Sequence, residues 1–445
     1  MKSIGDILTQ NKTPVVVDDG TTYKQVTIRT NYKGVVLRGT QNGSTILTKN
    51  QFSVSAGQFI LSRIDARNSA FGIIPDELEG AIVTNDFLAF DINEAEVERE
   101  FFNVFLQSPT FLEACIRASR GNTNRKRVDE TFFLNYQVDL PPLREQHKLI
   151  KQINEGRAHI AIAQGEITHQ QSLLAKLKQA ILQEAIQGKL TADWRAAHPD
   201  VEPASQLLQR IQDEKARLIA NKKLRKEKPL PKINPAEIPF EIPKGWEWCR
   251  LGQGIHLMNG NSFDSEDFKK GTGVKCIKIT NAGVGDFVET DDTLPLGFDK
   301  TYAKYQVFTG DLILALTRPY IATGMKISRC PESYDGALLN QRVAAIRPTD
   351  GLLNSDYAFL FLGSDFVLRG FQSEFESKGQ QPNLKSEHVT HLRLPLPPLA
   401  EQAAIVERVE ALMTSCRALE AEIAAARSHA VQLLQAVLKE AFAPA

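Results

Sequence analysis

The chain has 445 residues, in which 53 Lys and Arg balance 53 Asp and Glu, so the formal net charge at pH 7 is zero. This length predicts roughly two to four domains, and a hydrophobic content of 42% is enough to bury real cores. No apolar run approaches a membrane span, no apolar secretory segment follows Met1, and the five scattered cysteines lack CxxC spacing. These features argue against a membrane protein, a disulfide framework and a cysteine-held zinc ion, and they favour a cytoplasmic protein.

Residues 1–139 are rich in short β-type runs separated by Gly and Asn turns, which predicts a mixed α/β domain. Residues 244–395 have the same character. Gly57-Gln-Phe-Ile-Leu in the first region resembles Gly310-Asp-Leu-Ile-Leu in the second, and Thr30-Asn31 resembles Thr280-Asn281. The two regions diverge elsewhere, so we expect two copies of one domain with different surfaces.

A second repeat follows the first domain, because Leu140-Pro-Pro-Leu-Arg-Glu-Gln returns 256 residues later as Leu396-Pro-Pro-Leu-Ala-Glu-Gln. The register then holds without a gap for about 40 residues. Proline is tolerated where a helix starts, and Gly188 and Pro444 lie where the two helices should end. We therefore predict long helices over residues 140–187 and 396–445, each ~65 Å long at about 1.5 Å per residue.

Both predicted helices carry apolar residues in four-three alternation, which is typical of a coiled-coil seam. The first helix has three weak steps, at Gly156, Ala163 and Gln170. A helix of this length with an apolar stripe and polar flanks needs a partner, and the repeat supplies one; the alternative is that each helix packs on its neighbouring domain. The seam residues are Leu149, Ile153, Ile160, Ile167, Leu174, Leu177, Ile181, Ile405, Val409, Leu412, Leu419, Ile423, Leu433 and Val437.

Residues 188–243 differ in composition from both repeats. Charged helical residues over Gln206 to Leu224 run into a stretch rich in Lys and Pro that ends near Pro239. This pattern predicts a linker with a short helix. Its basic run could contact DNA, but a solvated linker is the simpler interpretation.

Motifs for catalysis are missing from the sequence. It has no GxxxxGK[ST] loop for ATP, no HExxH, no GxSxG, and no Asn-Pro-Pro-aromatic motif of the kind that holds a base for amino methylation. His388 and His391 have the spacing of a metal pair but lack a third ligand, so we expect no metal site and no catalytic residue.

Features for binding DNA are better represented. Around Gly121 the first domain has a loop rich in cations and amides, and the matching loop of the second domain is rich in amides but less basic. Arg pairs with guanine, Asn with adenine, and further cations can hold phosphates; solvated turns without a ligand are the alternative. The candidates in these loops and after the paired Gly-x-x-Ile-Leu strands are Arg63, Arg67, Asn68, Arg117, Arg120, Asn122, Asn124, Arg125, Lys126, Arg127, Thr317, Arg318, Tyr320, Lys378, Gln380, Gln381, Asn383 and Lys385.

These features together resemble the DNA specificity (S) subunit of type I restriction-modification enzymes over nearly the whole chain. The strongest motifs are the two LPPLxEQ helix starts and the helix ends LLAKLKQAILQEAIQGKLTADWR and LLQAVLKEAFAPA. Further motifs are GQFILSRIDARNSAFGIIPDELEGAIVTNDF in the first domain and IPKGWEW at residues 242–248. The first domain lacks the PKGW segment that precedes the second and begins with Ile4-Gly5-Asp6-Ile7, which resembles the stretch that starts at Leu251-Gly252.

The resemblance implies an α+β fold in which two target recognition domains, residues 1–139 and 244–395, are separated and joined by two repeated helices that form an antiparallel coiled coil. Each domain would read one half of an asymmetric bipartite sequence in double-stranded DNA. It also implies two methyltransferase (M) subunits and further restriction (R) subunits as partners. S-adenosylmethionine, ATP and Mg would be bound by those partners, and this chain would hold no cofactor.

Two other classes of function remain open at this point. The chain could be a coiled-coil scaffold that organises proteins without reading DNA, or a self-sufficient DNA-modifying enzyme with an unrecognised active site. The zero net charge argues against a DNA-binding protein that acts alone, because phosphate neutralisation usually demands a basic excess. Partner subunits that supply phosphate contacts would remove that objection.

Overall fold

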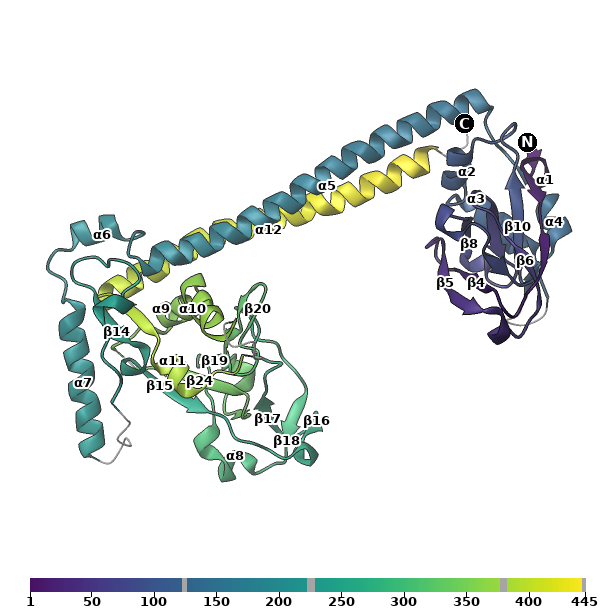
Figure 1. Ribbon diagram of the computed structural model, residues 1–445. Coiled ribbons are helices and arrows are strands. Elements are labelled where there is room, and N and C mark those ends of the chain that lie inside the picture. Colours follow the sequence, from purple (N-terminus) through teal and green to yellow (C-terminus); the bar gives the residue numbers. More distant parts are fainter. Residues whose placement is uncertain (122–125, 222–228, 350, 377–381, 442–445) are drawn as a thin grey trace. The chain divides into compact units, whose positions relative to one another are not determined.

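The structure is a computed structural model that describes the chain except for residues 122–125, 222–228, 350, 377–381 and 442–445 (Figure 1). The chain divides into two compact units. Unit 1 consists of Met1–Thr168 and Ala424–Ala445, and unit 2 consists of His169–Ile423. The long helices α5 (Leu143–Ile186) and α12 (Leu399–Ala441) each contribute to both units. Within the described residues, no helix combines the length and the apolarity that crossing a bilayer demands.

Unit 1 contains an antiparallel sheet in the order β2-β10-β7-β8 and a five-stranded sheet in the order β3-β6-β9-β4-β5. Short pairs β1-β13 and β11-β12 complete it. The strands are β1 (Lys2–Ser3), β2 (Leu8–Gln10), β3 (Thr13–Val16), β4 (Thr22–Ile28), β5 (Val35–Asn42), β6 (Asn50–Ser53), β7 (Phe59–Ser62), β8 (Phe71–Ile73), β9 (Ile82–Val83), β10 (Phe87–Ile92), β11 (Ser119–Arg120), β12 (Arg127–Val128) and β13 (Gln137–Val138). The short helices are α1 (Ile4–Ile7), α2 (Arg99–Phe105), α3 (Pro109–Ala118) and α4 (Glu130–Leu134).

Unit 2 contains an antiparallel sheet in the order β15-β24-β19-β22, a second sheet in the order β16-β18-β17-β23, and the pairs β14-β25 and β20-β21. The strands are β14 (Glu247–Arg250), β15 (Ile255–Asn259), β16 (Lys269–Lys270), β17 (Val274–Ile277), β18 (Asp292–Leu294), β19 (Leu312–Ala315), β20 (Tyr320–Ile321), β21 (Gly324–Met325), β22 (Ile327–Arg329), β23 (Leu338–Leu339), β24 (Val343–Pro348) and β25 (Arg393–Leu396). The helices are α6 (Ala192–Ala197), α7 (Ala204–Ala220), α8 (Phe298–Thr301), α9 (Ser355–Leu362), α10 (Asp365–Glu376) and α11 (Ser386–Thr390).

The central strands β7 and β19 have continuous apolar sequences because both of their faces are buried. In β7, Phe59 belongs to a core shared with the helices, while the next residue, Ile60, belongs to a core shared with the second sheet. Leu312 and Ile313 of β19 divide between two cores in the same way. The matching strand orders and matching cores confirm the predicted internal repeat of a mixed α/β domain.

The repeated LPPLxEQ motif anchors each long helix to its domain through its glutamine. Gln146 is fully buried, its Oε1 accepts a hydrogen bond from the Glu98 backbone N–H at 2.8 Å, and its Nε2 donates to the Pro141 carbonyl at 2.8 Å. Gln402 makes the equivalent bonds to Asn354 at 2.8 Å and to Pro397 at 3.0 Å. The motif therefore satisfies unpaired backbone groups at the starts of two helices at once.

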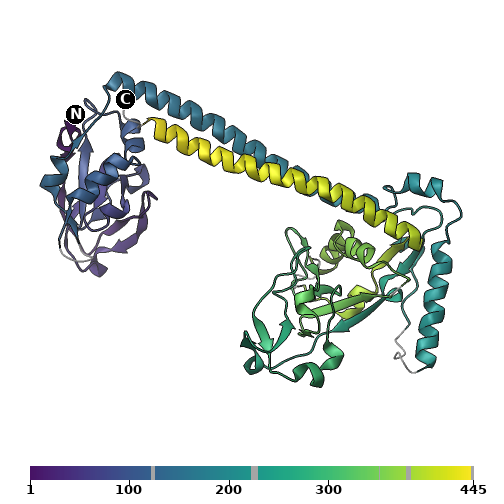
Figure 2. The same cartoon turned by 180° about the vertical axis from the view of Figure 1, so that it is seen from behind.

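The two long helices form an antiparallel pair in each unit, side by side in both views (Figures 1 and 2). In unit 2, Lys178 Nζ donates to Glu420 Oε1 at 2.6 Å. One column of the predicted seam is well covered: residues 153, 160, 167, 174 and 181 of α5 are each less than 9% exposed. The predicted coiled coil is thus confirmed, and its first turns also pack on the domains, because Ile153 and Ile405 lie in domain cores.

The second column of the seam is open beyond the first turns of the helices, which pack on the domains. Leu177, Leu419 and Leu433 remain 44%, 44% and 56% exposed. The corresponding column of α5 includes the weak positions Gly156, Ala163 and Gln170, whose small or polar side chains bury little apolar surface. Leu149, Leu412 and Ile423 are partly buried, and the side chain of Val437 lies outside the described residues. The helix pair therefore presents apolar side chains at its surface.

The segment predicted as a linker, residues 188–243, packs into unit 2 where it is described. Helix α7 buries Leu207 and Ile211 in the same core as Trp246 and the start of α12. Thr191, Arg195 and Trp246 donate hydrogen bonds to the carboxylate of Glu401, which is 1% exposed. In unit 1 the equivalent Glu145 is exposed. The same motif therefore has two environments.

Gly165 of α5 permits a direct test of helix stability. A Cβ built on it meets nothing within 4 Å, and its backbone is helical. Gly165→Ala is expected to raise the stability of α5 by about 0.5–1 kcal/mol, because alanine loses less backbone entropy in a helix. Urea denaturation followed by far-ultraviolet circular dichroism would measure the gain. Gly188→Ala is the control and should lower the stability, because Gly188 has a φ of +70° and Pro243 Cγ would lie 2.6 Å from the new Cβ. Equal effects of the two changes on stability would contradict this account.

Candidate nucleic-acid interface

In each domain, the two predicted DNA-contact loops are joined to one another. The first loop follows the central strand β7 or β19, and the second precedes α4 or α11. In the first domain the Val128 N–H donates to the Arg63 carbonyl at 2.8 Å, and in the second the Leu384 N–H donates to the Leu316 carbonyl at 2.7 Å. Loops more than 60 residues apart in sequence thus form one surface per domain.

In the second domain this surface contains several of the predicted residues. Thr317 and Asn383 form a β-bridge, and the Arg318 N–H donates to the Pro382 carbonyl at 3.1 Å. Asn383 and Lys385 are exposed, and Tyr320 begins the β20-β21 hairpin. The predicted contacts Lys378, Gln380 and Gln381 lie outside the described residues.

Around Gly121 in the first domain, three predicted arginines are paired with carboxylates of the same chain. Arg117 makes two hydrogen bonds to Glu113 Oε1, which raise its pKa, and Arg127 donates to Asp86 Oδ1 at 2.9 Å. Arg120 lies 3.6 Å from Asp129 and over the Phe132 ring. These carboxylates offset part of the positive charge that the sequence alone assigns to the loop. Lys126 is exposed, while Asn122, Asn124 and Arg125 lie outside the described residues.

Arg63 has a structural role in the fold. Its guanidinium donates to Glu130 Oε2 at 2.9 Å, its N–H donates to the Asp86 carbonyl at 2.8 Å, and its carbonyl accepts from Val128. The side chain is 24% exposed. Arg63 thus holds the two loops of the first domain together. Of the predicted contacts that follow it, Arg67 is partly buried and Asn68 is exposed.

Strained backbone gathers at these loops. Among the described residues, the non-glycine positions with positive φ are Asn31 (59°), Tyr32 (57°), Ser69 (61°) and Arg318 (50°). Ser69 and Arg318 lie in the loops after β7 and β19, and Asn31 and Tyr32 donate backbone hydrogen bonds to Asn68 and Ser69. Because each such residue costs free energy, strain at the loop surface of each domain indicates a role other than stability.

A half-buried lysine lies beside the loop arginine in each domain. Burial lowers the pKa of Lys12, and the nearby Arg63 lowers it further. Burial likewise lowers the pKa of Lys326, with Arg318 as the second cause. Neighbouring cations repel one another, and at Lys12 the carboxylate of Glu130, which pairs with Arg63, offsets part of this repulsion.

The structure also adds residues that the sequence analysis did not select. The tip of the β4-β5 hairpin, residues 29–34, lies against the loop that carries Asn68, and it includes the exposed cations Arg29 and Lys33. The sequence does indicate a β-hairpin here, because two β-type runs are separated by a short segment with Asn and Gly. The lysines Lys12 and Lys326 carried no such signal, since only folding brings them to the loops.

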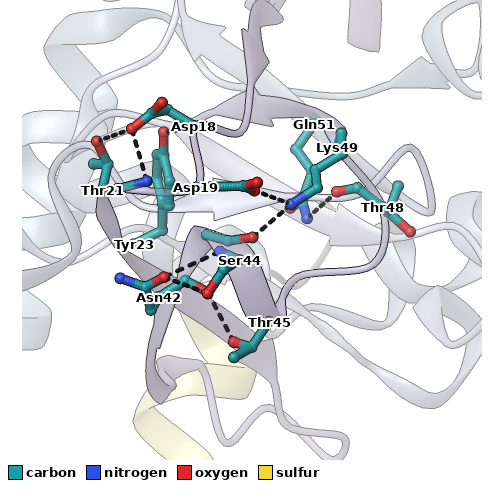
Figure 3. Close-up of polar contacts among 12 residues, drawn as sticks. Asp18, Asp19, Thr21, Tyr23, Asn42, Ser44, Thr45, Thr48, Lys49 and Gln51 are labelled. Atoms are coloured by element: carbon teal, nitrogen blue, oxygen red, sulfur yellow. Dashed lines mark hydrogen bonds and ion pairs between the residues drawn. The ribbon is translucent and has the colours of Figure 1, made fainter.

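The opposite end of the β4-β5 hairpin is braced by polar contacts within the chain (Figure 3). Lys49 Nζ donates to Asp19 Oδ1 and to the Gly43 carbonyl at 2.7 Å, and Asp18 Oδ2 accepts from Thr21 Oγ1 at 2.9 Å. Asn42 Oδ1 accepts from the N–H and hydroxyl of Ser44. These groups satisfy one another, so we interpret this end as a structural brace.

The predicted histidine pair forms part of a helix end. His388 Nδ1 accepts a hydrogen bond from the Lys385 N–H at 3.0 Å at the start of α11, and His388 Nε2 lies 3.6 Å from Glu374 Oε1. Within the described residues, no group of three or more His, Cys, Asp or Glu side chains is arranged to hold a metal ion. The contact with Lys385 gives His388 a local structural explanation.

Comparison with known proteins points to one family. The sequence model described as "Type I restriction modification DNA specificity domain" matches residues 1–169 and 243–426. The EcoAI specificity subunit of Escherichia coli is 30% identical over 383 residues, and the EcoEI subunit of the same organism is 24% identical over 394 residues. Each match covers 77% of this chain but 64% of the relative, so the chain spans less than two thirds of the length of these relatives.

Solved structures of low sequence identity share the fold. The HsdS subunit from Thermoanaerobacter tengcongensis is 18% identical with a TM-score of 0.52, covering 99% of this chain and 95% of that one. A chain from a structure of a type I R-M system gives a TM-score of 0.56 at 18% identity, covering 99% and 96%. Since the family's two matched regions make up well over half of the sequence and include both structural repeats, the chain belongs to the type I restriction modification DNA specificity domain family.

Proposed function

We propose that this chain is the specificity subunit of a type I restriction-modification system and that it reads an asymmetric bipartite sequence in double-stranded DNA. One observation carries the proposal. Two domains with the same strand order place different polar residues on the same joined loops: Arg67 and Asn68 in one, and Arg318, Tyr320 and Asn383 in the other. Different side chains on equivalent surfaces would recognise different half-sites.

The helix pair is proposed to dock two methyltransferase (M) subunits, with restriction (R) subunits joining the full complex. The open apolar column supports this role, because Leu177, Leu419 and Leu433 stay exposed, and Ile162 and Leu173 of α5 are exposed as well. Bound M subunits would supply much of the phosphate contact that a chain of zero net charge lacks. Such a complex would act in the cytoplasm, where it has access to the chromosome.

In this proposal the chain contributes no catalytic residue. The side-chain clusters around Glu401 and around Lys49 are accounted for by packing and local bonding. Methyl transfer with S-adenosylmethionine, and cleavage driven by ATP with Mg, would take place on the partner subunits. The membership of a specificity-domain family is consistent with this division.

The proposal is tested by mapping adenine methylation genome-wide in cells that express the M subunit with and without this chain. We expect a new motif of two different blocks with a fixed gap, because each domain would read one block at a separation set by the helices. An M subunit expressed alone is the control, and it should leave no such motif.

The outcome separates the proposal from its main rival. If the chain forms a stable complex with M but no new methylation motif is found, the chain would be a scaffold that organises proteins through its helices. Methylation by the purified chain alone would contradict its non-catalytic role. Replacing residues 244–395 with another recognition domain should then change one block of the motif and leave the other.

A further inference from the structure

The tip of the β4-β5 hairpin is a fixed loop at the surface of the first domain. The Arg29 N–H donates to the Gly34 carbonyl at 2.9 Å and closes the turn. The Asn31 N–H donates to the Asn68 carbonyl at 2.9 Å, and the Tyr32 N–H donates to the Ser69 carbonyl at 3.3 Å. The tip is thus tied to the loop that already carries predicted DNA contacts.

The backbone of the tip displays one side chain in a defined direction. Asn31 and Tyr32 both have left-handed backbone angles, and asparagine tolerates this region far better than tyrosine does. Tyr32 is held in place by edge contact with the buried Phe71 ring, with centroids 5.7 Å apart. The neighbouring Asn31 is exposed, and among the described residues none makes a hydrogen bond to its side-chain amide. Anchoring by Tyr32 therefore leaves the Asn31 amide available to a ligand.

The charges beside Asn31 suit a nucleic acid. Arg29 and Lys33 flank it and are both exposed. Within the described residues no ion pair joins either of them to a carboxylate, in contrast to Arg117 and Arg127. An amide between two unneutralised cations matches the common pattern in which phosphate contacts position a side chain that reads a base.

Among its described residues, the second domain has no equivalent of this exposed hairpin tip. Its strand β17 corresponds to β4, because each pairs in parallel with the equivalent strands β23 and β9. The residue that resembles Asn31 in sequence is Asn281, but Asn281 is fully buried, and its amide donates to the Val288 carbonyl at 2.8 Å and to Thr290 Oγ1 at 3.2 Å. Asn281 thus braces its own loop, whereas the matching Asn31 of the first domain is exposed.

Resting on the proposed DNA-reading function, we propose that Asn31 reads an adenine in the first domain's half-site while Arg29 and Lys33 contact the flanking phosphates. Asparagine can accept from adenine N6 and donate to N7, the pairing its amide geometry fits best. Tyr32 is a positioning residue that holds the amide in place. The hairpin tip would make the two half-sites unlike each other.

The test is Asn31→Gly, which removes the amide but keeps the left-handed backbone free of strain. The full chain, in complex with its M subunit, selects from duplexes randomised in both half-sites, and bound sequences are counted. We expect the preference for adenine at one position of one half-site to fall about 5- to 150-fold, with the other half-site unchanged. Lys33→Ala should instead weaken binding to all sequences alike. It should also reduce the slope of log K against log salt concentration by about 1.

Thr40→Ala is the matched control, because Thr40 is exposed on the same hairpin near the braced end, and its sequence preference should equal that of the wild type. An unchanged preference in Asn31→Gly would overturn this inference while leaving the proposed function intact. A uniform loss across sequences, or a change in both half-sites, would overturn it as well. If the wild-type complex selects no sequence at all, the proposed function itself fails.

Discussion

Replacing Glu401 with alanine is expected to lower the free energy of unfolding of unit 2 by about 3 kcal/mol, because a buried carboxylate with three donors is lost. Glu401 is 1% exposed, and Thr191, Arg195 and the Trp246 indole all donate to it. The side chain of Arg195 is 22% exposed, so water can hydrate part of its guanidinium once the carboxylate is removed. The expected loss of stability therefore lies at the lower end of the range seen when one partner of a buried ion pair is removed.

The chain offers a matched control in Glu145→Ala at the equivalent position of the repeat. Glu145 is exposed, and among the described residues no side chain donates to its carboxylate. Its loss should therefore cost less than about 0.5 kcal/mol of stability. Hydrogen exchange at the starts of α5 and α12 would compare the two helices. All three tryptophans lie in unit 2, so urea denaturation followed by tryptophan fluorescence reports on Glu401→Ala independently. Equal, small effects at both positions would show that the buried cluster contributes little stability.

Replacing Gly43 with alanine is expected to destabilise unit 1 by about 3 kcal/mol, because the new Cβ overlaps backbone atoms that cannot move alone. It would lie 1.9 Å from the Asp18 carbonyl oxygen and 2.8 Å from the carbonyl carbon. The Asp18 N–H is held by Tyr23 Oη at 3.0 Å, and the Gly43 N–H donates to the Thr21 carbonyl at 2.8 Å. Relief of the overlap would disrupt the brace shown in Figure 3.

Gly20→Ala tests the same brace without backbone overlap. The nearest atom to its Cβ would be Asp18 Oδ2 at 3.3 Å, the end of a side chain that can turn aside. We expect a loss below about 1 kcal/mol there. Amide exchange in β3 to β6 would measure both variants, and a Gly43→Ala protein with wild-type exchange would refute the steric argument.

The repeat and the long helices were predictable because their signals are local and occur twice. The predicted helices over 140–187 and 396–445 correspond to α5 and α12, which begin three residues later in each case. The motif glutamines Gln146 and Gln402 make the same bonds in both copies. The open column at Leu177 and Leu419 was not predicted, because exposure depends on what the partner helix places opposite.

The candidate site was predicted only in part. The sequence selected Thr317 and Asn383 in two separate loops, and only the fold brings them together in a β-bridge. By contrast, Arg117 and Arg127 looked like free cations in the sequence but are paired with Glu113 and Asp86. Such pairing joins residues up to 41 positions apart and cannot be inferred from composition.

Periodicity and repetition along the chain were sufficient to establish two copies of an α/β domain, two paired long helices and the family resemblance, because helix faces and turns are encoded by neighbouring residues. Only the folded chain decides which of two identical carboxylates is buried, at Glu401 or at Glu145. It also decides that the asparagine at 31 is presented while the one at 281 is enclosed. Burial and hydrogen bonding depend on segments distant in sequence, and these contacts arise only when the cores assemble.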